Sequence, residues 1–236
     1  KQNRTLRTLV KARSKELLPC LLQKRVRGVE ISTEGWFDGR KFLPAFNHTI
    51  ESKRLLDGDR GPQTGCMGNV VWYVKNPHRD QLVQRLLVPL TPLLKKAQYI
   101  GPIDVNAIIT ENKAYFLEFT TRFGYDAIQA FFEITFDDPF DFLWKVSTQS
   151  SNFKISTDYG CAVRLTVPPY PYSQDGAFIV NKGVQFLDIP EKAMSHVWLA
   201  DVAKKNDTYV MAGVDGVLGC VSARGRSIKE IRQRVY

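Results

Sequence analysis

The 236-residue chain has no long apolar run, few histidines and few cysteines, and each shortage excludes a class of protein. No stretch of about 18 apolar residues is present, so the sequence predicts no membrane-spanning helix. Its three histidines lie too far apart for a zinc site. Its four cysteines form no C-x-x-C pair, which favours reduced thiols in a cytoplasmic protein over a disulfide framework.

The charge balance limits the kind of ligand. The first 18 residues are basic but lack the apolar core and small-residue cleavage site of a secretory signal. A formal net charge of +9 suits an anionic ligand, either a nucleotide or a nucleic acid. Basic residues concentrate in segments 1–27 and 224–234 rather than in one stripe with stacking aromatics, which disfavours nucleic acid. A solvated basic face without any ligand would give the same composition.

Residue spacing predicts an α+β chain. Hydrophobic residues make up 44%, enough to bury the core of one large domain or two small ones. Periodicity and turn residues predict helices over residues 4–18, 82–94 (broken by Pro89 and Pro92), 126–134, 139–146 and from Ser227 onward. They predict strands over residues 20–26, 29–37, 40–46, 70–74, 102–110, 114–120, 161–167, 177–183, 195–202, 208–213 and 216–223.

Three local signals fix boundaries along the chain. Asp38-Gly39 predicts a hairpin between two strands. Ser227, followed three residues later by Glu230, predicts a helix amino terminus with a capping box. From Cys161 the texture changes to short strands, so we place a boundary near residue 158, between domains 1–158 and 159–236.

The segment KRLLDGDRGPQTGCMGNV, residues 53–70, is a candidate phosphate or substrate loop. It contains four glycines, and glycine lets the backbone bend closely around a phosphate. It lacks the Gly-Lys-Ser/Thr ending of a Walker A loop, so the signal alone is weak. Lys53 and Arg54 precede it and could bind phosphate, although surface Lys-Arg pairs are common. The candidate loop residues are Gly61, Pro62, Thr64, Gly65 and Gly68.

Asp104 and Glu118 form a candidate metal site. They lie on two apolar strands joined by a turn at residues 111–113, and pairing across that turn places them on one face of the sheet. Two carboxylates that close repel each other unless a cation such as Mg²⁺ lies between them. Two unrelated acids facing solvent are the alternative. Arg122 lies four residues after Glu118. Its planar guanidinium is suited to bind a phosphate or a carboxylate, and the alternative is an ion pair with Asp126.

The two segments together resemble a known family. KRLLDGDRGPQTGCMG and YFLEFTTRFG, followed by short strands, are similar to the motifs of the phosphoribosylamine–glycine ligase family of the ATP-grasp superfamily. The similarity runs from about Leu21 onward and implies the carboxyl-terminal two-thirds of such an enzyme: part of an ATP-grasp fold, then a small strand-rich domain. Thr120, Ser52 and Cys66 replace the family's asparagine, histidine and glycine, and Tyr125-Asp126-Ala127 replaces Asp-Pro-Glu.

The resemblance implies roles for individual residues. ATP would be bound by Gln23 and Lys24 at the base edge, Glu30 near the ribose and Arg54. Mg²⁺ or Mn²⁺ would be held by Glu118, Asp104 and Thr120. Arg122 and Lys53 would be catalytic, with Arg122 holding the acyl phosphate or substrate.

The resemblance also implies a reaction. It is the ATP-dependent ligation of a carboxylate to an amine through an acyl phosphate, as in purine biosynthesis, with small-molecule substrates. The alternatives are a divergent ATP-grasp protein that binds a nucleotide or partner without turnover, and a nucleic-acid-binding module supported only by the charge. The sequence carries no signal for an oligomeric state.

Overall fold

The computed structural model describes residues 7–8, 11, 23–172, 178–185 and 189–236. The helix expected over residues 4–18 therefore lies almost wholly outside the described residues. Within them, no helix is both long and apolar enough to cross a membrane. Residues 23–26 carry no regular secondary structure, so the strand expected over residues 20–26 is wrong for the part that is described.

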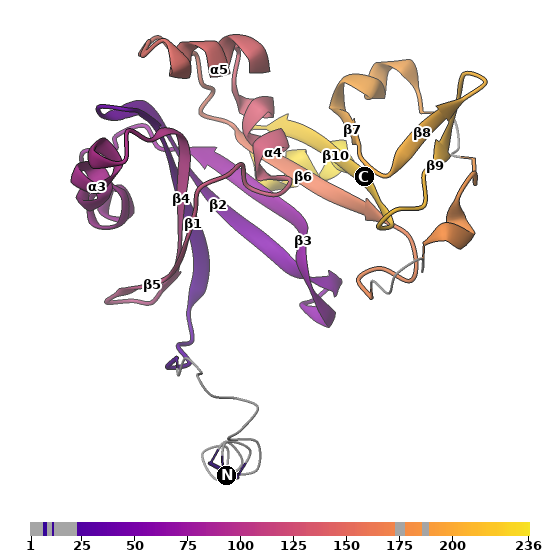
Figure 1. Ribbon diagram of the computed structural model, residues 1–236, viewed down its shortest axis with the longest axis horizontal. Coiled ribbons are helices and arrows are strands. Elements are labelled where there is room, and N and C mark those ends of the chain that lie inside the picture. The colour runs from indigo at the N-terminus through magenta and orange to yellow at the C-terminus, as the bar shows by residue number, and fades with distance from the viewer. Residues whose placement is uncertain (1–6, 9–10, 12–22, 173–177, 186–188) are drawn as a thin grey trace.

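An eight-stranded antiparallel sheet forms the body of the molecule (Figure 1). Its strands follow the order β5 (Ala114–Thr120), β4 (Ile100–Ile109), β1 (Val29–Asp38), β2 (Phe42–Leu56), β3 (Arg60–Tyr73), β6 (Tyr159–Thr166), β10 (Val217–Gly225) and β7 (Val197–Leu199). A separate two-stranded sheet joins β8 (Val202–Lys205) to β9 (Thr208–Met211).

The hairpin expected at Asp38-Gly39 joins β1 to β2. A carboxylate oxygen of Asp38 accepts hydrogen bonds from the backbone N–H groups of Arg40 (2.8 Å) and Lys41 (2.7 Å). Gly39 adopts a φ of 90°, a conformation that glycine reaches without steric cost. The dipeptide therefore acts as its sequence predicts.

The glycine-rich segment is a strand pair and not a loop. β2 continues to Leu56, a turn follows, and β3 begins at Arg60, so most glycines of residues 53–70 lie within β3. Register shifts between Ser52 and Leu56 mark irregular pairing in this hairpin. Gly68 faces β6, where a Cβ atom would lie 3.1 Å from the Ala162 carbonyl oxygen. Gly68 thus permits close strand packing, a role that composition alone could not distinguish from that of a loop glycine.

A broken helix covers one face of the sheet, as the two prolines predict. It comprises a π turn, η1 (Val83–Leu87), a 3₁₀ turn, η2 (Val88–Leu90), and α3 (Thr91–Lys96). A buried cluster on this face joins strands and helix through Phe37, Phe46, Val74, Val83, Leu87, Leu94, Ile103 and Val105.

Two aromatic-rich helices pack beside the polar part of the opposite face. They are α4 (Ala127–Ile134) and α5 (Pro139–Ser147), close to their expected bounds. The centres of the Trp36 and Phe142 rings lie 4.9 Å apart in an edge-to-face arrangement, and the centres of the Phe142 and Phe131 rings lie 5.3 Å apart. This cluster fixes α4, and with it the loop that follows β5.

The sheet continues across residue 158, because β6 pairs with β3 through Gly68–Val163 and its neighbours. Regions 1–158 and 159–236 thus share one hydrogen-bonded sheet. Beyond β6 lie two 3₁₀ turns, η3 (Ile179–Asn181) and η4 (Glu191–His196), and the final helix α6 (Ile228–Val235). Ser227 caps α6 by accepting a hydrogen bond from the Glu230 N–H at 3.2 Å, as predicted.

The strand expected over residues 177–183 is wrong for its described part, 178–183, since η3 occupies the middle of this segment. Its apolar β-branched residues favour a strand by propensity, but Ile179 and Val180 are exposed. The short strands β7 and β9 lie within the ranges that the sequence predicts, and β10 overlaps its predicted range, 216–223, but continues to Gly225.

Candidate functional site

A row of polar side chains crosses one face of the sheet and lines a cleft of about 460 Å³. Strand alternation and register place the side chains from β5, β4 and β2 on this common face, and β3 and the loop after β5 supply the remaining lining residues. The cleft is lined by Glu51, Lys53, Gln63, Thr64, Gly65, Asp104, Asn106, Glu118, Thr120, Arg122, Gly124 and Tyr125. The structure thus brings together the two carboxylates, Arg122, Lys53 and part of the glycine-rich segment.

A β-bulge in β5 places Glu118 on the same face as Asp104. Near the turn Ala107 pairs with Phe116, but Asn106 pairs with Glu118, so Leu117 is an extra residue. Without this extra residue Asp104 would lie opposite Phe119, and Glu118 would point to the other face. The expected common face is therefore correct, although Asp104 pairs directly with Thr120 and lies diagonal to Glu118.

Although its sequence is apolar, β5 is not buried. It is an edge strand, and Phe116 and Phe119 are about half exposed. Glu118 is exposed as well, which leaves its carboxylate open to a ligand in the cleft. β4, by contrast, is buried over most of its length.

Asp104 is a buried carboxylate with a perturbed pKa. It accepts a short hydrogen bond from the Ser32 hydroxyl, and the Asn106 side-chain amide lies 3.5 Å from its other oxygen. Burial raises the pKa of Asp104 to about 6, and the negative charges of Glu51 and Glu118 add to the effect. The Ser32 hydrogen bond and the positive charge of Arg122 oppose it. A cation in the cleft would relieve this repulsion.

Glu34 lies directly opposite Asp104 across the β1–β4 pair. Glu34 is 6% exposed, so its carboxyl group does not face water. Burial raises the pKa of Glu34 to about 8, with a contribution from the charge of Asp104. At neutral pH this carboxyl group is mostly protonated, and Asp104 carries the charge of the pair.

Lys53 lies between two acids. Its Nζ atom is 2.6 Å from a Glu30 carboxylate oxygen and 3.5 Å from Glu51. Burial acts to lower the pKa of Lys53, but the hydrogen bond to Glu30 and the charge of Glu51 outweigh it, so the pKa is raised. For the neighbouring acid Glu51, burial raises the pKa, and the positive charge of Lys53 opposes this rise. Lys53 therefore stays charged, with its ammonium group held at the cleft.

Arg122 has no ion-pair partner among the described residues. Its guanidinium donates to the carbonyl of Phe123 at 2.9 Å and otherwise faces the cleft. The possible pair with Asp126 is absent from the described part of the chain, because Asp126 instead bonds Arg164 at 2.7 Å. Arg122 thus keeps donors available for an anion.

The other predicted site residues lie around the cleft rather than in it. Glu30 reaches it through Lys53, whereas Arg54 donates to the Gly61 carbonyl at 2.8 Å on an exposed part of the hairpin. Gln23 and Lys24 are exposed and outside regular structure. None of Gln23, Lys24, Arg54, Gly61, Pro62 and Gly68 lines the cleft, whereas Thr64 and Gly65 do. Their predicted roles stay predictions.

Sequence reasoning missed four residues that the fold places at the site: Ser32, Glu51, Asn106 and Gln63. A signal for two of them was present. Asn106 lies two residues after Asp104, and Glu51 lies two residues before Lys53, so strand alternation puts each on the same face as its neighbour. The β1–β4 pairing that brings Ser32 to Asp104 joins distant segments and has no local signal.

The donor set at the cleft fits a hard divalent cation. Asp104, Glu118, Asn106 and Thr120 all present oxygen atoms, and Mg²⁺ is usually bound by one or two carboxylates together with water and phosphate. Over the ranges that the structure describes, no three His, Cys, Asp or Glu side chains converge as a metal-ligand group. A cation bound here would therefore use a sparse protein ligand set, as Mg²⁺ at a nucleotide does.

Comparison with known proteins gives consistent relatives. The family model of the phosphoribosylglycinamide synthetase ATP-grasp (A) domain matches residues 10–127. Phosphoribosylamine–glycine ligase from Clostridium acetobutylicum is 26% identical over 92% of this chain and 51% of its own length. The ligase from Caldanaerobacter subterraneus is 26% identical over 94% of this chain and 56% of its own length. The chain thus spans about half the length of these relatives, less than the two-thirds that the sequence motifs imply.

Solved structures support the same fold. A phosphoribosylamine–glycine ligase from Thermotoga maritima superposes with a TM-score of 0.60 at 20% identity, covering 91% of this chain and 52% of that one. A phosphoribosylaminoimidazole carboxylase ATPase subunit from Aquifex aeolicus gives a TM-score of 0.53 at 16% identity, covering 91% and 56%. The chain has an ATP-grasp fold and belongs to the phosphoribosylglycinamide synthetase ATP-grasp (A) domain family.

Proposed function

We propose that this chain forms the nucleotide-and-metal half of an ATP-dependent carboxylate–amine ligase of the phosphoribosylamine–glycine ligase type. The observation that carries the proposal is the convergence of Asp104, Glu118, Arg122 and Lys53 on one cleft. Two acids for a metal and two cations for anionic groups are what phosphoryl transfer to a carboxylate requires. The names of the curated relatives support the substrate pair, glycine and phosphoribosylamine.

A divalent cation would be held by Asp104 and Glu118, with Asn106 and Thr120 as further oxygen donors. When bound, it supplies charge neutralisation at the transferring phosphoryl group. Ser32 orients Asp104 through its hydrogen bond, and Glu34, mostly protonated at neutral pH, adds little further negative charge next to it. The carboxylate pair is thus prepared to accept positive charge.

The reaction needs two anion-binding groups from the protein. In the first step a substrate carboxylate oxygen attacks the terminal phosphorus of ATP, giving an acyl phosphate and ADP. In the second step an amine attacks the acyl carbon and releases phosphate, leaving an amide and a proton. We assign Arg122 to the substrate carboxylate or acyl phosphate, because its guanidinium lines the cleft and forms no ion pair with any residue that the structure describes. We assign Lys53 to the nucleotide phosphates, with Glu30 holding its ammonium group in place.

Calorimetric titration of the full-length natural protein with Mg-ATP tests this function. We expect saturable binding, and ADP release that requires both glycine and phosphoribosylamine. Absence of nucleotide binding by the full-length protein would contradict the proposal. The thiols of Cys66, Cys161 and Cys220 are free and buried, which supports a reducing, cytoplasmic compartment for the protein. The assay is therefore run under reducing conditions.

A second function is favoured by one observation. Lys53 is already neutralised by Glu30 and Glu51, and Thr120 stands where the family has a metal-binding asparagine. Both features would weaken phosphoryl transfer while leaving a nucleotide cleft. On this alternative the protein binds ATP but releases no ADP with any of a panel of small carboxylates and amines.

A further inference from the structure

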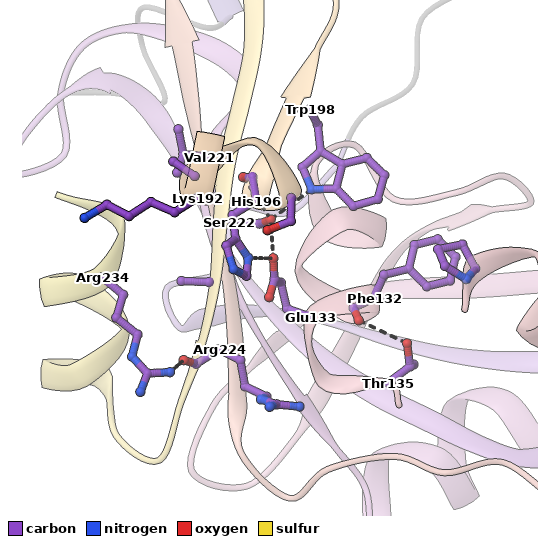
Figure 2. Close-up of a pocket in the computed structure, with 14 residues that line it drawn as sticks. Phe132, Glu133, Thr135, Lys192, His196, Trp198, Val221, Ser222, Arg224 and Arg234 are labelled. Atoms are coloured by element: carbon purple, nitrogen blue, oxygen red, sulfur yellow. Dashed lines mark hydrogen bonds and ion pairs between the residues drawn. The ribbon is translucent and has the colours of Figure 1, made fainter. Parts of the chain in front are cut away.

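A second cavity, of about 780 Å³, lies at the carboxyl-terminal part of the sheet and shares no lining residue with the cleft. Its walls come from the end of α4, the strand β10, the turn η4 and the last helix α6 (Figure 2). The volume is within the range of about 300–1,000 Å³ that is usual for small-molecule sites.

At the centre of this cavity, the carboxylate of Glu133 takes part in a hydrogen-bonded network. One carboxylate oxygen of Glu133 accepts from the Ser222 hydroxyl at 2.6 Å and lies 2.8 Å from His196 Nδ1. The indole N–H of Trp198 donates to the Ser222 hydroxyl oxygen at 2.9 Å. Figure 2 shows these four side chains together. Among the described residues that line the cavity, Glu133 is the sole carboxylate, and it already has partners.

Three basic side chains, Lys192, Arg224 and Arg234, also line the cavity. Arg234 is held by Glu230 at 2.6 Å and donates to the backbone carbonyl of Arg224. The Nε atom of Arg224 lies 3.7 Å from a carboxylate oxygen of Asp158. The central carbon of its guanidinium lies 5.0 Å from the centre of the Phe136 ring. These contacts fix both guanidinium groups while leaving other N–H donors unused.

Lys192 completes the positive margin. No ion pair of Lys192 occurs within the described residues, and in Figure 2 it extends along the same side of the cavity as Arg234. The opposite side is apolar: the rings of Phe132 and Trp198 lie 6.5 Å apart at an interplanar angle of 22°. The cavity thus has a cationic margin and an aromatic wall.

We propose that this cavity binds a small organic phosphate, with the phosphate at Lys192 and Arg234 and a flat or apolar portion against Trp198 and Phe132. Arginine forks and a lysine ammonium group are the side chains best suited to phosphate oxygens. A volume of about 780 Å³ suits a metabolite rather than a nucleic-acid strand. The site is separate from the cleft and does not depend on the ligase reaction.

Titration of the full chain with phenyl phosphate, followed by calorimetry and by ³¹P NMR, tests the proposal. We expect saturable binding of phenyl phosphate that is tighter than binding of inorganic phosphate, and no binding of phenol. Lys192→Glu and Arg234→Gln should each weaken binding by ~10-fold or more, since each removes a charge-assisted contact. Both side chains are exposed, so the melting temperature should stay close to that of the wild type.

Two matched variants locate the site. Lys229→Glu on α6 and Lys192→Glu on η4 change the net charge by the same amount. Because Lys229 lies outside the cavity, Lys229→Glu should leave binding unchanged. Lys53→Ala, in the cleft, should also leave it unchanged. The proposal is overturned if phenyl phosphate does not bind, if Lys229→Glu weakens binding as much as Lys192→Glu, or if only Lys53→Ala abolishes it. Equal affinity for inorganic phosphate and phenyl phosphate would contradict the proposed contact of the ligand with Trp198 and Phe132.

Discussion

The guanidinium of Arg164 on β6 lies 2.7 Å from a carboxylate oxygen of Asp126, and so ties the middle of the sheet to the loop that carries Arg122. Arg164 is 5% exposed, and its guanidinium lies 4.1 Å from the centre of the Tyr125 ring. Asp126 adopts a left-handed φ of 59°. This buried pair holds the loop in place.

Removing one member of this pair should destabilise the protein more than removing both. Arg164→Met leaves Asp126 without a partner, and we expect a loss of roughly 3–5 kcal/mol of unfolding free energy. Asp126→Asn keeps a residue that tolerates the left-handed conformation. The double variant should therefore recover much of the loss in urea denaturation. A double variant as unstable as the sum of the two single variants would show that the two side chains are not coupled.

Glu118→Gln should abolish most turnover of the full-length enzyme. It removes one of the two charges assigned to the metal while preserving side-chain volume, and we expect a loss of at least ~10²-fold in steady-state rate. The melting temperature without nucleotide should be unchanged or slightly raised, because repulsion with Asp104 falls. Glu111→Gln, on the turn of the same hairpin, is the control. Near-wild-type turnover of Glu118→Gln would refute the assigned metal site.

Glu34→Gln should change how stability depends on pH. The pKa of Glu34 is about 8 in the fold, above its ordinary value of 4.5. Its favourable contribution is thus complete below pH 4.5 and is lost as pH rises through 8. Glutamine stays neutral, so the variant should gain stability over the wild type as pH rises, by up to about 1.4 kcal/mol per pKa unit.

Urea denaturation at pH 5 and pH 9 measures this effect. The two proteins should be close at the lower pH, and the variant should be the more stable one at the higher pH. Glu111→Gln should follow the wild type at both. A constant difference between Glu34→Gln and the wild type across this range would mean that Glu34 is ionised in the fold.

The three buried thiols should resist modification. Burial raises the pKa of Cys66 to about 12, of Cys161 to about 11 and of Cys220 to about 12. In a Cys20→Ser background, we expect the native protein at pH 8 to react with a disulfide reagent at least ~10²-fold more slowly than the urea-unfolded chain, because the thiolate is the reactive species. Rapid native labelling of any one thiol would show that its segment opens.

Features with a local physical cause were predictable from the sequence. The turn at Asp38-Gly39, the cap at Ser227 and the helix broken at Pro89 each follow from a few neighbouring residues. The core of the site was also predictable, since Asp104, Glu118, Lys53 and Arg122 do line one cleft.

Features set by pairing between distant segments were not predictable. The bulge at Leu117 is needed to bring Glu118 to the Asp104 face, yet no glycine or proline marks it. The burial of Glu34 depends on strand β4, which follows in the chain much later. The glycine-rich segment has the composition of a loop, and only the neighbouring strand β6 explains why glycine is needed at Gly68.

The strand order also bears on how the chain folds. β1, β2 and β3 follow one another through short turns, so this meander can form from local contacts. β4 must then return to pair with β1, and β6 must add to the far side of β3 after long intervening segments. Closing such loops costs entropy before any contact is gained, which slows folding toward the millisecond-to-second range of non-local β topologies. The cleft cannot form before β4 pairs with β1, and a chain in which only the meander has formed exposes the unpaired edges of β1 and β3.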